Sequence, residues 1–446
     1  MNLDELKQAF VARYPGAGEP FVCRVPGRVN LMGEHLDYNG LPVLPMAIDR
    51  AIYLAFAPNR DGEFRLANQN PAYPDVSFEN SADIAPSPGG AWENYAKAAV
   101  QGLNQSLSVE EYPGLDVLLD SDLPDSAGLS SSSALVVGFG MAYLAALGFT
   151  LGEDIPRLKL AGILAGAEHY VGTAGGGMDQ TAILMGEAGS AIRINFIPFQ
   201  VDPVPLPDGV AVIVCDSLVK ATKTGDAQQR YNAGPASCSL IAALINAHLQ
   251  AEFGNEFEIE CLGELWYGSL CFNRTEVKQL LDTVLPEARI APDKIARRLN
   301  MPVAQVREYW LDSMPDEPEG LPLQARARHV FNEYYRVMEG RDALLAGDVT
   351  TFGRFMNASQ QSCADDYGIS TPELDALCAA LRDAGCLGAR LTGAGFGGAV
   401  VALAPAKEVD RVLREIEESY YRKVVKWEGA IPAFCTTAGA AARYNS

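Results

Sequence analysis

The chain has 446 residues, with 48% apolar and 20% charged side chains, a balance that is typical of folded globular proteins and excludes a chain that is disordered throughout. Its 35 Lys and Arg residues against 56 Asp and Glu residues give a formal net charge of −21, which disfavours nucleic acids and anionic membranes as partners. At roughly 100–200 residues per domain, the length allows two or three domains.

The nine cysteines occur singly, from Cys23 to Cys435, and the sequence contains no CxxC pair. Because metal ribbons and disulfide frameworks space their cysteines regularly, we interpret these residues as reduced thiols of a cytoplasmic protein. Residues 1–7 contain neither the basic nor the apolar segment of a secretion signal, which favours the same location. We expect the protein to be a monomer.

Short strands and two helices are predicted in the first part of the chain. Branched and aromatic residues bounded by Gly, Pro, Asn or Asp predict strands at residues 51–56, 63–66 and 115–119. Residues 92–103 favour a helix. The stretch 126–152 carries no charge, but its apolar part, 134–149, is shorter than the roughly 20 residues that cross a bilayer. We therefore expect a buried helix there rather than a membrane span.

A domain boundary is expected near residue 205. Prolines and a glycine gather there, just before an apolar, strand-like run at residues 210–215: Pro203, Pro205, Pro207 and Gly209. The expected domains are therefore residues 1–205 and 206–446.

The second half favours helices. Apolar residues at helical spacing over 409–420 predict a helix with one buried face. Residues 290–310 superficially resemble a helix-turn-helix, although the acidity of the chain disfavours DNA reading. Strands and helices that mix without strict alternation predict an α+β fold.

The strongest local motif is LPDSAGLSSSSA, residues 123–134, which joins a strand-like run to the uncharged helix. A Gly/Ser loop at a helix N-terminus presents backbone N–H groups and the positive end of the helix dipole, so it can bind phosphate without a lysine. It is not a Walker A loop, because no GKS or GKT follows. A helix merely capped by serine is the alternative, but four consecutive serines exceed what one cap requires.

Two further segments are rich in glycine. In GGGMDQ, residues 175–180, three glycines allow close backbone approach and Asp179 could point toward a ligand, although a tight turn with a solvated carboxylate fits as well. RLTGAGFGG, residues 390–398, precedes a strand-like run at 399–403. It therefore lacks the strand-to-helix geometry of a Rossmann loop.

The fourth motif is PGRVNLMGEHLDYNG, residues 26–40. Groups that can hydrogen-bond a polyhydroxylated ligand crowd into six residues, with Arg28 upstream: Glu34, His35, Asp37 and Asn39. A metal site is the second interpretation. The chain has only four histidines, however, and none of the other three lies near His35 in the sequence, which disfavours zinc. A polar surface turn is the third.

Together these segments resemble the three signature motifs of the GHMP small-molecule kinases, and specifically of their galactokinase branch. Residues 26–40 closely match the sugar-binding motif of galactokinases, GLSSSSAL is similar to the ATP phosphate loop, and LTGAGFGG is similar to the third motif. GGGMDQ and EHYVG, residues 168–172, lean toward the subgroup of galactokinases and N-acetylgalactosamine kinases. The resemblance implies a two-domain α+β fold with the active site in the cleft between the domains.

The resemblance also implies roles for individual residues. Asp179 matches the catalytic aspartate, and Arg28 matches the arginine that pairs with it and keeps it ionised. Five residues match the positions that bind the sugar: Glu34, His35, Asp37, Gly176 and Tyr231.

The ATP site is implied in the same way. Trp92 resembles the tryptophan that lines the adenine pocket, while Ser132 and Glu168 fall where the family binds Mg2+. The amides of the serine loop would hold the triphosphate: Gly128, Leu129, Ser130, Ser131, Ser132 and Ser133.

One departure from the family's pattern lies just after Tyr231. Residues 233–235 are Ala-Gly-Pro where the family often has arginines. Because proline fits poorly inside a helix, we expect Pro235 to disfavour a helix at this position after Tyr231.

The function expected from this resemblance is ATP-dependent phosphorylation of galactose at its anomeric C1 hydroxyl. An N-acetylgalactosamine 1-kinase and a catalytically silent sensor of galactose and ATP are the alternatives. A kinase of a non-sugar alcohol such as mevalonate or homoserine is disfavoured, because it has no use for GEHLDYNG. We expect galactose to be the better substrate, with weaker turnover of N-acetylgalactosamine.

Overall fold

A computed structural model describes residues 2–124, 128–172, 175–219, 226–254 and 257–445. The chain forms two compact units. The first unit comprises Met1–Val29, Pro45–Ile192 and Thr436–Ser446, and the second comprises Asn30–Leu44 and Arg193–Cys435.

This division differs from the linear boundary expected near residue 205. Its physical reason is strand pairing by short returning segments: Val22 pairs with Asn445 in the first unit, and Val43 pairs with Ile194 in the second. Pro203 and Pro205 lie within a strand rather than in a linker.

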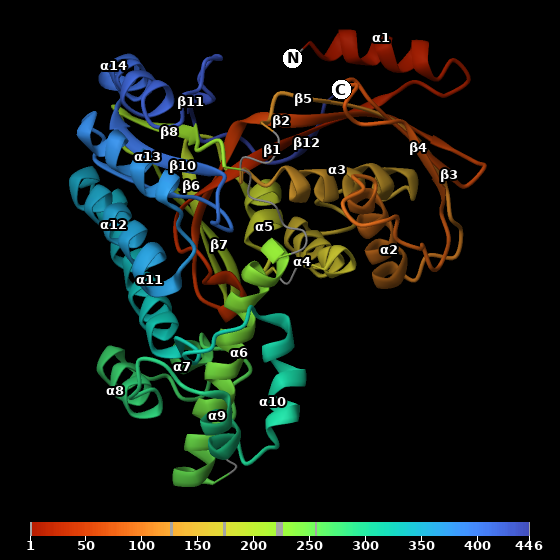
Figure 1. Ribbon diagram of the computed structural model, residues 1–446. Helices are drawn as coiled ribbons and strands as arrows, with labels where there is room; N and C mark the ends of the chain where they lie inside the picture. Colours follow the sequence, from red (N-terminus) through yellow and green to blue (C-terminus); the bar gives the residue numbers. More distant parts are fainter. Residues whose placement is uncertain (1, 125–127, 173–174, 220–225, 255–256, 446) are drawn as a thin grey trace. The chain divides into compact units, whose positions relative to one another are not determined.

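A six-stranded sheet forms the centre of the first unit, with strand order β12-β1-β2-β5-β3-β4 (Figure 1). Its strands are β1 (Phe21–Met32), β2 (Leu44–Asn59), β3 (Glu63–Asn68), β4 (Val76–Glu79), β5 (Gly114–Ser121) and β12 (Arg443–Asn445). The predicted strands at 51–56, 63–66 and 115–119 are confirmed as parts of β2, β3 and β5.

Helices cover both faces of this sheet (Figure 1). They are α1 (Leu3–Arg13), α2 (Asn94–Leu107), α3 (Ser131–Ala146), α4 (Arg157–Ala167), the 3-10 helix η2 (Glu168–Val171) and α5 (Met178–Met185). Leu6 and Phe10 of α1 pack on Ala51, Tyr53 and Ala55, alternate residues of β2 that share one face. α2, α3 and α4 lie on the opposite face.

The predicted helices of the first unit are confirmed. The region 92–103 contains most of α2, and the uncharged stretch contains α3, most of whose residues are buried. Among the described residues, no helix has the length and apolar character that a membrane crossing requires.

The second unit contains a four-stranded sheet of order β11-β8-β10-β9 and a two-stranded sheet that β7 forms with β6. These strands are β6 (Ser190–Phe196), β7 (Phe199–Pro205), β8 (Val210–Asp216), β9 (Gly388–Leu391), β10 (Ala399–Pro405) and β11 (Ala433–Thr436). The apolar runs at 210–215 and 399–403 therefore form strands, as predicted.

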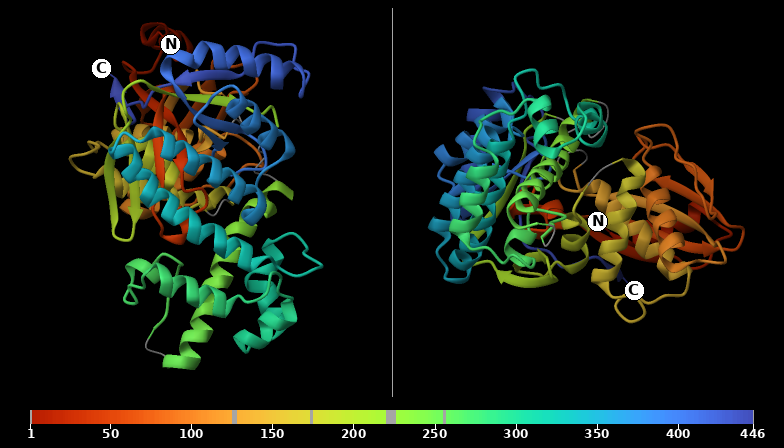
Figure 2. Two further views of the ribbon diagram at one scale, coloured as in Figure 1. Left: turned by 90° about the vertical axis from the view of Figure 1, so that its left-hand side faces the viewer. Right: turned by 90° about the horizontal axis from the view of Figure 1, so that it is seen from below.

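Helices make up most of this unit: α6 (Asp226–Phe253), α7 (Glu264–Tyr267), α8 (Arg274–Val284), α9 (Pro292–Leu299), α10 (Val303–Tyr309), α11 (Leu323–Leu345), α12 (Val349–Ser362), α13 (Pro372–Asp383) and α14 (Val409–Ile416). Short 3-10 turns are η1 (Asp37–Asn39), η3 (Leu311–Ser313) and η5 (Ala406–Glu408), and π-helical turns are η4 (Cys363–Tyr367) and η6 (Glu417–Arg422). α8 and α9 pack against α6, whereas α12 and α13 pack on β9 (Figures 1 and 2).

The expectation that Pro235 disfavours a helix is wrong, because α6 continues through it. A proline inside a helix removes one backbone hydrogen bond and costs about 3 kcal/mol. α6 packs against α8, α9 and α11, and such tertiary packing supplies most of the stability of helices in proteins. The Ser237 hydroxyl donates to the Ala233 carbonyl at 2.6 Å in the same turn.

Candidate active site

In the first unit, Asp179 and Arg28 form a bidentate ion pair. α5 begins after Gly177, whose φ of +95° suits glycine, and this places Asp179 in the first turn of the helix. Arg28 Nε donates to Asp179 Oδ1 at 2.6 Å, and Nη2 donates to Oδ2 at 2.9 Å. Arg28 Nη1 donates to the Gly128 carbonyl at 2.7 Å, so one guanidinium connects the glycine segment to the serine loop.

The serine loop ends where α3 begins. Ser130 is the N-cap, with a left-handed φ of 60°, and its side chain makes no capping hydrogen bond. Its hydroxyl instead donates to Asp179 Oδ2 at 2.5 Å. The interpretation of this loop as a serine cap is therefore wrong for Ser130.

Glu168 lies in η2, directly after α4, and faces this helix start. The hydroxyl of the buried Ser133 donates to Glu168 Oε1 at 2.6 Å and lies 3.5 Å from Asp179 Oδ2. The family resemblance implies Ser132 and Glu168 as Mg2+ ligands, and the serine whose hydroxyl contacts Glu168 in the structure is Ser133. Consecutive residues of a helix point about 100° apart, so the two neighbouring serines project in different directions.

The other predicted nucleotide residues lie in the same unit. Trp92 is buried just before α2, where its Nε1 donates to the Pro74 carbonyl at 3.2 Å. The Leu129 side chain is buried, and its carbonyl accepts from the Arg28 backbone amide at 3.1 Å. Ser131, Ser132 and Gly176 are half-buried.

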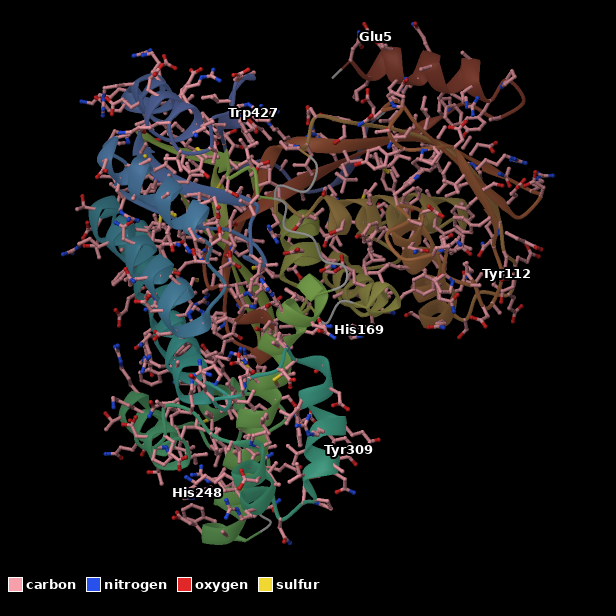
Figure 3. All side chains as sticks on the ribbon, viewed as in Figure 1. Glu5, Tyr112, His169, His248, Tyr309 and Trp427 are labelled. Carbon is pink, nitrogen blue, oxygen red and sulfur yellow. The ribbon has the colours of Figure 1, made fainter. Side chains whose placement is uncertain are left out.

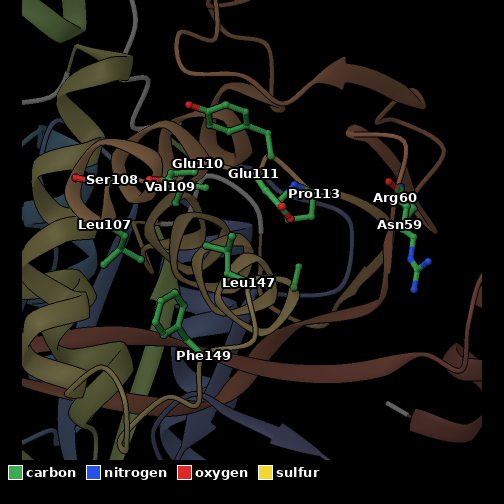
Figure 4. Close-up of a pocket in the computed structure, with 12 residues that line it drawn as sticks. Asn59, Arg60, Leu107, Ser108, Val109, Glu110, Glu111, Pro113, Leu147 and Phe149 are labelled. Atoms are coloured by element: carbon green, nitrogen blue, oxygen red, sulfur yellow. The ribbon is translucent and has the colours of Figure 1, made fainter.

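A separate pocket of the first unit has a volume of about 660 Å³ (Figure 4). It lies where β2, α2 and α3 end, and Arg60, Tyr112 and Phe149 are among its lining residues. None of the predicted site residues lines it within the described part of the chain.

In the second unit, Glu34 is buried and joins the sugar motif to the third motif. Its Oε1 accepts from the Gly393 amide at 2.9 Å and from Arg390 Nη1 at 3.3 Å. Arg390 is fully buried and donates also to the Asn30 carbonyl at 3.0 Å. Sequence reasoning missed Arg390, although an arginine beside a strand-like, buried run is a signal that an acidic partner lies nearby.

A second acid supports the same loop and was also missed. Glu333 of α11 is fully buried and accepts from the Gly33 amide at 2.9 Å, Ser359 Oγ at 2.6 Å and Arg336 Nε at 2.6 Å. Burial alone would raise the pKa of the Glu333 carboxyl, but the nearby Arg336 and Arg390 outweigh it and lower this pKa to about 2.

The His35 ring is buried and hydrogen-bonded on both sides. Nδ1 lies 2.9 Å from Tyr38 Oη, and Nε2 lies 3.2 Å from the Ala394 carbonyl. Burial lowers the pKa of His35 to about 3, so the ring is neutral at pH 7.

His35 and Tyr231 line one pocket of the second unit, with a volume of about 440 Å³. Tyr367, Arg230 and Arg326 are among its other lining residues. The structure does not bring Glu34 or Asp37 into this lining. Asp37 is half-buried in η1, next to Tyr38.

Models of known protein families match three parts of the chain. The galactokinase galactose-binding signature matches residues 8–58, the GHMP kinases N terminal domain matches residues 94–187, and the GHMP kinases C terminal model matches residues 341–422. These regions contain the sugar motif, the serine loop with Asp179, and the third motif.

Curated relatives match nearly the whole chain. The galactokinase of Dictyostelium discoideum is 32% identical over 95% of this chain and 89% of its own length. The galactokinase of Chloroflexus aggregans is 35% identical over 93% of this chain and 92% of its own length.

Solved structures have the same fold. The crystal structure of Lactococcus lactis galactokinase complexed with galactose covers 99% of both chains at 26% identity, with a TM-score of 0.79. The mevalonate kinase of Methanococcus jannaschii shares the fold at 17% identity and a TM-score of 0.55, covering 95% of this chain and 99% of its own. The α+β expectation is confirmed, and the chain belongs to the galactokinase family of the GHMP kinases.

Proposed function

We propose that this protein transfers the γ-phosphoryl group of ATP to the C1 hydroxyl of galactose, giving galactose 1-phosphate. The observation that carries the proposal is the Asp179 carboxylate, held by Arg28 at two points and lying 2.5 Å from Ser130 at the start of α3. Asp179 accepts or orients the proton of the C1 hydroxyl, and its ion pair with Arg28 favours the carboxylate form that this task needs. Turnover of ATP that depends on galactose, with galactose 1-phosphate as product, tests the proposal.

The nucleotide is bound through the backbone rather than through a lysine. The amides of residues 128–133 and the dipole of α3 attract the triphosphate, and this local positive potential offsets the acidity of the chain. Trp92 contacts the adenine. The protein's own contribution to phosphoryl transfer is placement and charge stabilisation.

A Mg2+ ion fits the oxygen donors at the start of α3. Carboxylate and hydroxyl oxygens are ligands that Mg2+ accepts, and Glu168 lies within hydrogen-bond distance of Ser133. Glu168 with Ser132, as the family resemblance implies, or with Ser133, which contacts it, would hold the ion. When bound, the ion neutralises charge on the transferring phosphoryl group.

Two serine variants decide between these ligands. Replacing the serine that binds the ion by Ala should raise the Mg2+ concentration needed for half-maximal activity, because one oxygen ligand is lost. From its contact with Glu168, we expect the larger shift for Ser133→Ala. Activity measured against Mg2+ concentration in S132A, S133A and, as the matched control, S131A compares the three serines. A larger shift in S132A would identify Ser132 as the Mg2+ ligand. If the Mg2+ concentration for half-maximal activity were unchanged in both S132A and S133A, neither serine would bind the ion and both would be structural residues.

The sugar is recognised by Glu34, His35, Asp37, Gly176 and Tyr231. Galactose and N-acetylgalactosamine differ at C2, and the contacts implied for Glu34, His35 and Asp37 are to hydroxyls that both sugars share. The glycines 175–177 bring no side chains, so they permit the acetamido group without requiring it.

Galactose should therefore be the best substrate, N-acetylgalactosamine should be turned over measurably but more weakly, and glucose, which misplaces the C4 hydroxyl, should be turned over little. The measurement is kcat/KM for the three sugars under one set of conditions. If N-acetylgalactosamine were preferred by about tenfold, or roughly 1.4 kcal/mol in transition-state binding, the protein would be an N-acetylgalactosamine kinase. Binding of galactose without turnover would identify a sensor.

The remaining proposals concern the state of the protein. All nine cysteines are free, which supports a reducing, cytoplasmic location. The exposed large apolar side chains come from many separate segments, from Val11 to Trp427, which supports a monomer. A solution mass near 47.8 kDa tests the second proposal.

A further inference from the structure

The direction of each hydrogen bond around His35 follows from one fixed acceptor. A carbonyl oxygen can only accept, so the bond between His35 Nε2 and the Ala394 carbonyl requires a proton on Nε2. The ring is neutral, so Nδ1 carries none and must accept from Tyr38 Oη at 2.9 Å. The His35 ring is therefore the Nε2-protonated tautomer.

The same reasoning extends to the groups behind Tyr38. Tyr38 uses its one proton on His35, so the 2.6 Å bond between Tyr38 and Tyr367 is donated by Tyr367. Tyr367 then accepts from the Cys238 thiol, whose Sγ lies 3.4 Å away. These hydrogen bonds all run in one direction, from Cys238 through both tyrosines to His35. They join α6, η4 and η1.

The backbone conformation also suits this series of hydrogen bonds. His35 has a left-handed φ of 62°, and its carbonyl accepts from Asn39 Nδ2 at 2.9 Å. A Cβ on Gly234 of α6 would lie 2.8 Å from Tyr38 Oη and 3.2 Å from Tyr367 Oη. The glycine of the Ala-Gly-Pro departure after Tyr231 is therefore the residue that lets both tyrosine hydroxyls approach α6.

We infer that Tyr38 and Tyr367 are positioning residues that, together with the Ala394 carbonyl, hold the Nε2-protonated His35 ring in one orientation, and that galactose binding depends on this fixed orientation. The inference rests on the proposed function, because it assigns the sugar contact to the segment that carries His35. His35 and Tyr367 both line the 440 Å³ pocket. The orientation of the His35 ring therefore determines the shape of the pocket wall next to Tyr367.

The tautomer can be measured without turnover. The chain has only four histidines, and ¹⁵N labelling of histidine gives a small set of ring signals. His169 and His248 are labelled in Figure 3. His169 is exposed and His248, on α6, is half-buried, whereas His35 and His329 are buried. His35→Gln assigns the His35 signals by their loss. The wild-type protein should show the Nε2-protonated form for His35 at pH 7.

Tyr38→Phe should shift the ¹⁵N signal of His35 Nδ1 and raise the KM for galactose about tenfold, because Nδ1 loses its hydrogen-bond donor inside the protein. The KM for ATP and kcat should stay close to wild type. Tyr367→Phe should act in the same direction but less, since Tyr38 keeps its own proton for His35. Gly234→Ala, which would normally favour a helix, should resemble Tyr38→Phe because its methyl group displaces the Tyr38 hydroxyl.

Tyr421→Phe is the matched control, since its buried hydroxyl donates to the Asp216 carbonyl at 2.7 Å in the same unit. It should leave the His35 signals and both KM values unchanged.

A wild-type ring protonated on Nδ1 would overturn the inference, as would a Tyr38→Phe protein with unchanged His35 signals and galactose KM. Equal rises in both KM values would indicate a merely structural role. If Tyr38→Phe did not fold, Tyr367→Phe and Gly234→Ala would decide by the same readouts. If the wild-type protein did not turn over galactose, the proposed function would be refuted. The ¹⁵N spectrum would then still test the tautomer assignment by itself.

Discussion

Replacing Asp179 with Asn is expected to lower kcat for galactose phosphorylation by about 10²-fold or more, because the amide cannot accept the proton of the C1 hydroxyl. The new side chain has nearly the same shape, and its oxygen can still accept from Arg28. Arg28 also keeps its bond to the Gly128 carbonyl. Galactose binding measured by calorimetry should persist, so the loss should appear in kcat rather than in the affinity for the sugar.

The control for this variant is another aspartate of the first unit that pairs with an arginine. Asp116 Oδ1 accepts from Arg65 Nη1 at 2.6 Å, and Asp116 is buried. Asp116→Asn removes the same charge from a comparable ion pair in the sheet, so kcat should stay close to wild type. An Asp179→Asn enzyme that kept more than about a tenth of wild-type kcat would exclude Asp179 as the base. Circular dichroism of both variants separates lost chemistry from lost folding.

Local features of the sequence predicted much of the fold. β2, β3, β5, β8 and β10 follow from runs of branched, aromatic and apolar residues, and α2 and α3 from helical patterns, because each depends on neighbours in the chain. The serine loop was recognised for the same reason, as a Gly/Ser segment at a helix start. The partnership of Asp179 with Arg28, separated by 151 positions, came from the family resemblance rather than from any local pattern.

The supporting groups could not be predicted in this way. Arg390 and Glu34 are 356 positions apart, and Glu333 and Gly33 are 300 apart. A local pattern in the sequence cannot predict such contacts, because the two residues come together only when the sheets and helices pack. The choice between Ser132 and Ser133 depends on the rotation of one residue around α3, which a motif does not specify.

The cluster around Glu333 should be one of the main sources of stability in the second unit. Breaking a buried ion pair by removing one partner typically costs about 3–5 kcal/mol, because the other charge stays buried without compensation. Glu333→Gln keeps the shape of the side chain but removes its charge from Arg336 and weakens its bond to the Gly33 amide. We therefore expect Glu333→Gln to unfold at a clearly lower urea concentration at pH 7.

Glu408→Gln is the matched control. Glu408 accepts from Arg411 Nε at 2.8 Å across three residues, the same spacing as Glu333 and Arg336, but both partners are partly exposed. Exposed pairs contribute little, since water already solvates both charges. Unfolding of Glu408→Gln should therefore follow wild type closely. Equal destabilisation of the two variants would contradict the special role of burial at Glu333.

The pH dependence of this destabilisation gives a second and sharper test. The Glu333 carboxyl has a pKa of about 2 in the folded protein against an ordinary value of 4.5, so its contribution is complete above pH 4.5 and is lost as the pH falls toward 2. The size of this shift corresponds to about 3 kcal/mol. Wild type should therefore lose a part of its stability on acidification that Glu333→Gln never had. The difference in free energy of unfolding between the two proteins should be largest at pH 6 and smaller at pH 3. A difference that stayed constant between these two pH values would mean that the Glu333 charge does not stabilise the fold, and that Gln disturbs only the local packing around Gly33.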